Sequence, residues 1–128
     1  MSVHRRLRLL VQPWRLVVER LDAATPMSVA VTHLPEQGFA ALVRSLESVT
    51  VVREAKDSDC GVVWRAIEIA GSFAFSETGV LAAIASPLAE AGVSIFAVNS
   101  FETDFVLVPE GDLEQARAAV EAAGHLLG

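Results

Sequence analysis

The sequence predicts an α+β protein in which two helices cover one face of an antiparallel sheet. After Trp64, segments with strand-like and helix-like apolar spacing alternate, and glycines bound the helical segments. Only six residues, 99–104, separate two strand-like segments, a length that favours a hairpin over a crossover. The resulting order is strand, helix, strand, strand, helix and a possible final strand. This order is the ferredoxin-like β-α-β-β-α-β unit.

The first strand and first helix of this unit lie between residues 65 and 92. Residues 65–69 (RAIEI) alternate as a strand does, and residues 79–92 predict a helix. Ser76 or Thr78 can cap the start of this helix, and Gly92 suits the left-handed position after its end. Its apolar residues recur at helical spacing and form one face: Val80, Ala83, Ile84, Pro87, Leu88 and Ala91.

The hairpin and the second helix follow. Residues 93–98 (VSIFAV) and 105–108 (FVLV) predict the two strands of the hairpin. Residues 112–124 predict the helix, with Asp112 and Gln115 at the spacing of a capping box. Its expected buried stripe is Leu113, Ala116, Ala119, Val120 and Ala123. Residues after Gly124 can form a short edge strand.

The first half of the chain is less regular. Residues 14–21, 39–43 and 48–53 predict strands, and no convincing helix lies between the first two. We interpret this half as a degenerate copy of the same unit, which divides the chain into residues 1–62 and 63–128. The arginine-broken N-terminus, MSVHRRLRLLVQPWRL, predicts a frayed end that leads into the first strand.

Composition and charge restrict the function. The chain has 128 residues, 52% of them hydrophobic, and a net charge of −6. Residues 66–128 contain Arg117 as their one basic side chain against nine acids, which disfavours nucleic acid as a partner. We expect no membrane partner and a cytoplasmic location, because we find neither a signal-peptide core nor an apolar run of membrane-spanning length.

Metal, cofactor and catalytic sites are not expected. Cys60 is the one cysteine, and the three histidines are scattered without metal-ligand spacing. No phosphate-binding glycine motif is present. Glu77 and Asp104 could act as an acid/base pair, but no nucleophile–base pair accompanies them. We therefore expect a protein that is not an enzyme and has no cofactor.

The strongest local feature is SETGVL, residues 76–81, at the start of the first predicted helix. The first turn of a helix has unpaired N–H groups and a partial positive charge, which suits a carboxylate or phosphate. Gly79 has no side chain that would keep a ligand away from the backbone. The alternative is an ordinary cap followed by a permissive glycine. From connectivity, we expect this loop and the hairpin loop to lie at different ends of the sheet. A long loop or a partner domain would then be needed to bring Asp104 near Glu77.

The segment GSFAFSETGVLAAIASPLAEAGVSIFAVNSFETDFVLVPEGDLEQARAAVEAAGH resembles the second half of small bacterial tandem ACT-domain proteins. These proteins are related to the ACT domains of aspartate kinases and of the animal cytosolic arginine sensors. The resemblance implies a regulatory homodimer that binds an amino acid between two ACT units. It also leaves an alternative open, a ligand-free ACT-like dimerisation or interaction module.

The resemblance also implies which residues contact the ligand. The matching positions are Glu77, Gly79, Val80 and Leu81 at the helix start, and Ser100, Phe101 and Asp104 in the hairpin. Backbone N–H groups would bind the α-carboxylate, the two acids would bind an α-ammonium or a cationic side chain, and Phe101 would form an apolar wall. Glu102 is assigned to solvent. Two acids suggest arginine or lysine, whereas one carboxylate facing an α-ammonium suits any amino acid.

Overall fold

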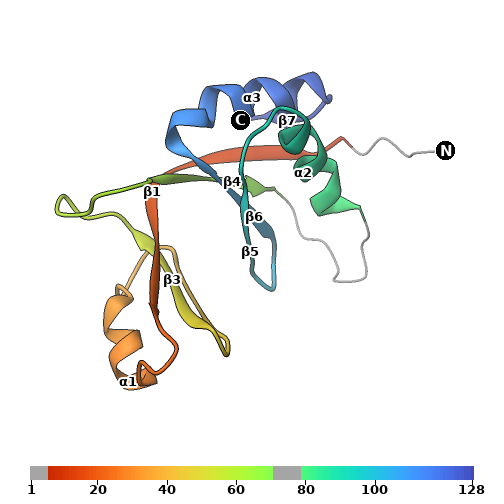
Figure 1. Ribbon diagram of the computed structural model, residues 1–128. Coiled ribbons are helices and arrows are strands. Elements are labelled where there is room, and N and C mark those ends of the chain that lie inside the picture. Colours follow the sequence, from red (N-terminus) through yellow and green to blue (C-terminus); the bar gives the residue numbers. More distant parts are fainter. Residues whose placement is uncertain (1–5, 71–78) are drawn as a thin grey trace. The chain divides into compact units, whose positions relative to one another are not determined.

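The computed structural model describes residues 6–70 and 79–128 and divides the chain into two compact units (Figure 1). The middle unit is Trp14–Trp64, and the composite unit joins residues 6–13 to residues 65–128. Strand β1 (Arg8–Asp22) gives its first residues to the composite unit and the rest to the middle unit. The division after Trp64 lies two residues from the expected one, but the N-terminal residues group with the C-terminal half.

The composite unit contains the elements expected after Trp64. They are β4 (Trp64–Ile69), α2 (Val80–Glu90), β5 (Phe96–Asn99), β6 (Asp104–Pro109), α3 (Leu113–Ala122) and β7 (Leu126–Leu127), with a 3-10 turn at Glu110–Asp112. Its strands are ordered β1-β4-β6-β5, and β7 pairs in parallel with β1. The start of β1 is thus an additional strand beside β4, which the six-element pattern does not include.

The prediction of a frayed N-terminus is wrong for the described residues before Pro13. Leu7 and Leu9 are buried in the core of the composite unit, whereas Arg6 and Arg8 are exposed. The Leu126 N–H donates to the Leu7 carbonyl at 2.9 Å, so β7 holds this segment in place. Arg6 and Arg8 alternate with Leu7 and Leu9, which is the alternation of a half-buried strand.

The core of the composite unit lies where α2 and α3 pack on the sheet (Figure 1). Val80, Ile84 and Leu88 recur every four residues along α2, so all three point to the same side. They meet Ala116 and Val120 of α3 and the buried side chains of the strands. The predicted helix faces are therefore confirmed at their buried positions.

The predicted capping box of α3 is wrong. Asp112 is at the N-cap position, but its side chain makes no capping hydrogen bond. The Gln115 side chain instead donates to the Ala91 carbonyl at the end of α2. The 3-10 turn that precedes α3 sets the direction of the chain there, and the spacing in the sequence does not reveal that turn.

The middle unit has three antiparallel strands and little helix. Its sheet order is β2 (Ala40–Arg44), β3 (Ser48–Glu54) and the second part of β1. Leu16–Asp22 pairs with Ser48–Glu54, and β2 pairs with residues 49–53. The segment without a convincing predicted helix forms only α1 (Met27–Ala30) and a 3-10 turn, Val31–His33. Ala30, Val49 and Val51 form a small core there.

Candidate functional site

The N-terminus of α2 begins at Gly79, which is exposed and has φ 81° and ψ −5°. This left-handed conformation favours glycine, because a side chain would be strained there. No side chain in the described part of the chain caps the helix. Val80 is only 4% exposed, so its contribution to a ligand site is limited to its backbone. The first turn of α2 therefore presents N–H groups rather than side chains.

The β5–β6 hairpin turns at Ser100–Thr103. The Ser100 N–H donates to the Thr103 carbonyl at 2.8 Å, and the Thr103 N–H donates to Ser100 Oγ at 3.1 Å. Phe101 is 76% exposed at the tip, and Glu102 is exposed beside it, as expected. Asp104 is half-buried at the first position of β6 and lies opposite Asn99. The turn thus fixes the positions from which Phe101 and Asp104 project.

The hairpin is attached to the end of β4, since Thr103 Oγ1 donates to the Ile69 carbonyl. Ile69 is the last residue of β4, from which the chain leads toward α2. The expectation that the two loops lie at different ends of the sheet is therefore wrong. Helix α2 returns the chain along the sheet, so β4 and β5 run in the same direction. Their C-terminal residues therefore lie at the same end of the sheet.

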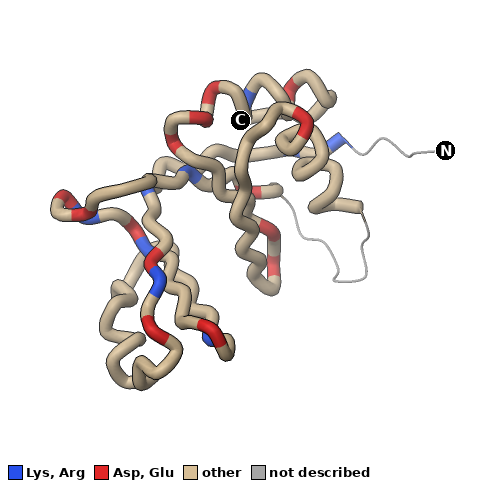
Figure 2. The backbone as a smooth tube through the Cα atoms, in the orientation of Figure 1, with Lys and Arg blue, Asp and Glu red and all other residues tan. Residues whose placement is uncertain are grey.

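The predicted site residues fall into three sets. Glu77, with the predicted caps Ser76 and Thr78, lies outside the described residues. The start of α2 carries Gly79, Val80 and Leu81, and the hairpin carries Ser100, Phe101 and Asp104. These six residues all belong to the composite unit. Figure 2 marks more acidic than basic residues along this unit.

A second hairpin with the same turn lies in the middle unit, and its residues are not among those predicted for the site. Residues 45–48 read SLES, against SFET at 100–103. The Ser45 N–H donates to the Ser48 carbonyl at 2.9 Å, and the Ser48 N–H donates to Ser45 Oγ at 3.3 Å. The two turns therefore share their bonding pattern. The repeated Ser-apolar-Glu-Ser/Thr motif, each time between two strands, is the signal that could have revealed it.

The two hairpins differ at the residue that follows the turn. Asp104 is in this position in the composite unit, and the fully buried Val49 is in the equivalent position of the middle unit. Helix α1 has four residues, whereas α2 has eleven. The middle unit therefore has neither the carboxylate nor the long helix of the predicted site.

The middle unit instead contains an ionic network around Arg53, which is 7% exposed. Its guanidinium donates two hydrogen bonds of 2.9 Å to the carboxylate of Asp59, and its Nε donates to Glu19 Oε1 at 3.1 Å. The hydrogen bond from Arg53, followed by that from the Lys56 N–H, holds the pKa of Asp59 well below its usual range. The hydrogen bond to Asp59 and, to a lesser extent, that to Glu19 raise the pKa of Arg53. The network fixes the loop after β3 to the sheet.

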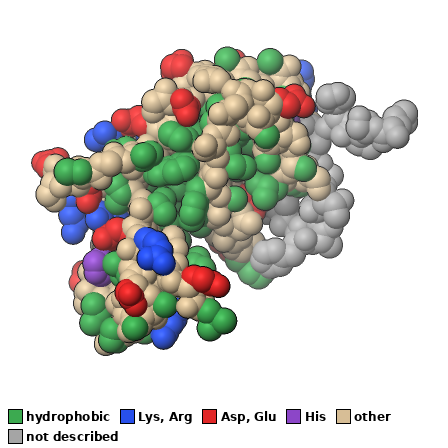
Figure 3. Space-filling view, in the orientation of Figure 1, with side chains coloured by type: hydrophobic (Ala, Val, Ile, Leu, Met, Phe, Trp, Pro, Cys, Tyr) green, Lys and Arg blue, Asp and Glu red, His purple; other side chains and the backbone are tan. Residues whose placement is uncertain are grey.

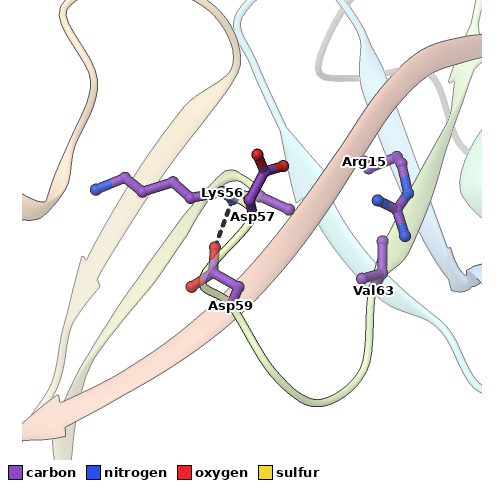
Figure 4. A pocket seen from close by; sticks show the side chains of 6 residues that line it. Arg15, Lys56, Asp57, Asp59 and Val63 are labelled. Carbon is purple, nitrogen blue, oxygen red and sulfur yellow. Dashed lines mark hydrogen bonds between the residues drawn. The ribbon is translucent and has the colours of Figure 1, made fainter.

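A pocket of about 210 Å³ lies beside this network (Figure 4). Its lining comes from β1 and the loop after β3: Arg15, Ala55, Lys56, Asp57, Asp59 and Val63. The Asp59 carboxylate is already paired with Arg53, and the Lys56 N–H donates to it at 2.6 Å. Its carboxylate therefore serves the turn of residues 56–59. The described residues contain no group of three or more His, Cys, Asp or Glu side chains that could hold a metal ion.

Comparison with known proteins finds similarity over part of the chain. Residues 61–122 match the model of the ACT domain family. The chain is 43% identical over 54 residues to the cytosolic arginine sensor for mTORC1 subunit 1 of Homo sapiens, and 40% identical over 57 residues to that of Rattus norvegicus. These alignments include 41% and 44% of this chain but only 16% and 17% of the sensors. The chain thus spans a small part of the length of its curated relatives.

Two solved structures share the fold over nearly the whole chain. Protein Atu0741 from Agrobacterium tumefaciens has a TM-score of 0.80 and 28% identity, covering 97% of this chain and 93% of its own. A protein of unknown function from Vibrio cholerae, VC0802, described as a possible transport protein, has a TM-score of 0.74 and 21% identity, covering 91% and 88%. No helix in the described ranges is both long and apolar enough to cross a membrane.

Proposed function

We propose that this chain is a non-catalytic regulatory protein that binds an amino acid at the start of α2 and the β5–β6 hairpin. One observation carries the proposal. The segment that matches the ACT domain, residues 61–122, contains both features, and the Thr103–Ile69 hydrogen bond attaches the hairpin to the end of β4. The similarity of part of the chain to an arginine sensor supports an amino acid as the ligand.

The chemistry of the two features suits the two ends of an amino acid. The N–H groups of Val80 and Leu81, next to the exposed Gly79, would bind the α-carboxylate with the help of the helix dipole. Asp104, half-buried and fixed by the hairpin turn, would bind a cationic group. Phe101 would cover the apolar part of the ligand, since this residue is 76% exposed.

We infer that the ligand is a cationic amino acid such as arginine or lysine. Glu77 would supply a second carboxylate, so one acid would bind the α-ammonium and the other the side-chain cation. A neutral amino acid would need only one of them. The two acids therefore favour a ligand with two positive groups.

The test is the thermal unfolding of the full chain with each of the twenty amino acids at millimolar concentration. A ligand at a hundredfold excess over its Kd would stabilise the fold by about 2.7 kcal/mol. Agmatine, which is arginine without the carboxylate, is the matched control and should give a much smaller shift. If no amino acid raises the midpoint, the proposal fails, and the alternative of a ligand-free interaction module replaces it.

A further inference from the structure

Ser100 and Thr103 form the ends of the β5–β6 hairpin turn, and each uses its hydroxyl group differently. Ser100 Oγ donates to the Thr103 carbonyl at 3.0 Å and accepts the Thr103 N–H at 3.1 Å. A serine hydroxyl has one proton, so the Ser100 side chain donates inside the turn. The Thr103 hydroxyl instead leaves the turn and donates to the Ile69 carbonyl at the end of β4. Ser100 therefore shapes the turn, whereas Thr103 attaches it to a neighbouring strand.

The end of β4 is a fixed point for this attachment. Ile69 is fully buried in the core of the composite unit, and the Ala70 N–H donates to the Arg8 carbonyl of β1 at 2.9 Å. The end of the strand is thus bonded to β1 and, through Thr103, to the hairpin. Thr103 is half-buried, and its β-branched side chain is short and restricted at χ1. The bond therefore restrains the hairpin backbone at residue 103.

Asp104 directly follows Thr103, so the same bond restrains the position of its carboxylate. Consecutive Cα atoms are only about 3.8 Å apart, and a restraint on Thr103 therefore carries over to Asp104. From Ile69 the chain leads to the start of α2 at Gly79, at the same end of the sheet. The Thr103 bond thus limits how far the carboxylate can move from the N–H groups of α2.

The matching hairpin of the middle unit is attached in another way. Ser45 Oγ bonds to the carbonyl and the N–H of Ser48 within the turn, the pattern described above for the other hairpin. The link to β1 is made by Arg20, whose guanidinium donates to the Glu47 carbonyl at 3.1 Å. Figure 3 shows arginine and lysine side chains at the surface of this unit, and the bond of Arg20 is likewise exposed. The short hydroxyl link thus belongs to the hairpin that carries the carboxylate.

We propose that Thr103 is a positioning residue that sets the separation between the Asp104 carboxylate and the N–H groups at the start of α2, so that one ligand binds both. This inference rests on the proposed function, because it concerns the same site. When the two groups are held at a fitting separation, the first contact makes the second effectively intramolecular. A hairpin without the Thr103 bond would still attract a cation, but it would gain less from a carboxylate on the same ligand. Thr103 therefore favours a complete amino acid over its decarboxylated analogue.

The first test measures the Kd of arginine and of agmatine by isothermal titration calorimetry of the full chain. Thr103→Val keeps the branched shape but removes the hydroxyl. The preference for arginine over agmatine should then fall about fivefold, the factor that corresponds to one net hydrogen bond. Thr103→Ser keeps the hydroxyl and should retain the preference. A general loosening of the fold weakens both ligands by the same factor, so it does not change this ratio.

Ser48→Ala is the matched control for this test. Ser48 has the position of Thr103 in the hairpin of the middle unit, and its substitution should leave the preference for arginine as in wild type. An unchanged preference in Thr103→Val, or an equal fall in Thr103→Ser, would overturn the inference.

The second test needs no ligand and measures the distance between the hairpin and α2 by double electron–electron resonance. Spin labels are attached at Glu102→Cys and Ala82→Cys, two exposed positions, in a Cys60→Ser background that removes the exposed free thiol. The distance distribution should broaden in Thr103→Val and stay as in wild type in Thr103→Ser. Broadening in a chain that binds no amino acid would keep Thr103 as the positioning residue and reject the proposed ligand. An unchanged distribution in Thr103→Val would overturn the inference even if arginine binds.

Discussion

His125 Nε2 lies 2.7 Å from the Ala83 carbonyl oxygen, which α2 cannot pair by itself. The usual donor to this carbonyl would be the N–H of residue 87, four positions along the helix, but that residue is proline. The Leu7 N–H donates to His125 Nδ1 at 3.1 Å, so the proton of the neutral ring is on Nε2. The buried histidine therefore replaces the hydrogen bond that Pro87 removes.

His125→Phe should destabilise the protein. The substitution leaves the Ala83 carbonyl and the Leu7 N–H without partners in the core, and a buried unpaired polar group costs about 1–3 kcal/mol. Urea unfolding measures the loss. His33→Phe is the control, because its side chain is 33% exposed and the change should cost less.

A double-mutant cycle with Pro87→Ala separates the hydrogen bond from packing. Alanine restores an N–H at position 87 that can donate to Ala83. We therefore expect His125→Phe to cost less in the Pro87→Ala background than in wild type. Equal costs in both backgrounds would show that His125 does not compensate for the proline.

The Asp59–Arg53 pair predicts acid sensitivity. The pKa of Asp59 is lowered in the folded protein, so its ionised form contributes stability that is fully present above its unfolded-state pKa. This contribution should decline below about pH 4 and disappear as the pH passes through the folded-state pKa. Asp59→Asn should therefore destabilise the protein at pH 7, and the difference from wild type should shrink as the pH falls.

Urea midpoints at a series of pH values test this prediction. Asp57→Asn is the matched control, because Asp57 lies in the same turn, is exposed, and is not among the carboxylates bound to Arg53. Its midpoints should follow those of wild type. A constant difference between Asp59→Asn and wild type across the pH series would contradict the assignment.

The sequence predicts the features of the fold that depend on the spacing of apolar residues within a single helix or strand. The stripe of α2 is readable because Val80, Ile84 and Leu88 recur at helical spacing. Residues 8–13 were not predicted as a strand, because the arginines that precede and begin this short segment resemble a frayed end until β7 and β4 supply its partners. The capping box predicted at Asp112 is wrong, because the 3-10 turn before α3 is not visible in the spacing of the sequence.

The candidate site was partly predictable for the same reason. The helix start and the hairpin can each be identified from local sequence, but their relative positions depend on the direction of two strands. The Thr103–Ile69 hydrogen bond links residues 34 positions apart, and no local pattern indicates it. The ionic network of Arg53 likewise joins Glu19 of β1 to Asp59 in a loop.

Asp104→Asn should abolish the ligand-induced rise in the unfolding midpoint. The substitution keeps the shape of the side chain but removes the charge that would bind the cationic group. Thermal unfolding with and without arginine measures the effect. Glu102→Gln is the control, because Glu102 lies in the same hairpin but is exposed, and it should retain the shift. An unchanged shift in Asp104→Asn would remove Asp104 from the site.

The chain should bind one amino acid per molecule rather than two. The hairpin of the middle unit has the same turn, but Val49 is in the position of Asp104, and α1 has only four residues. A buried valine cannot bind a cation, and a single helical turn offers few aligned N–H groups. Isothermal titration calorimetry with the ligand identified by the thermal screen measures the stoichiometry. A value of two per chain would show that the middle unit also binds, and a Ser45→Ala variant would then test whether its hairpin is responsible.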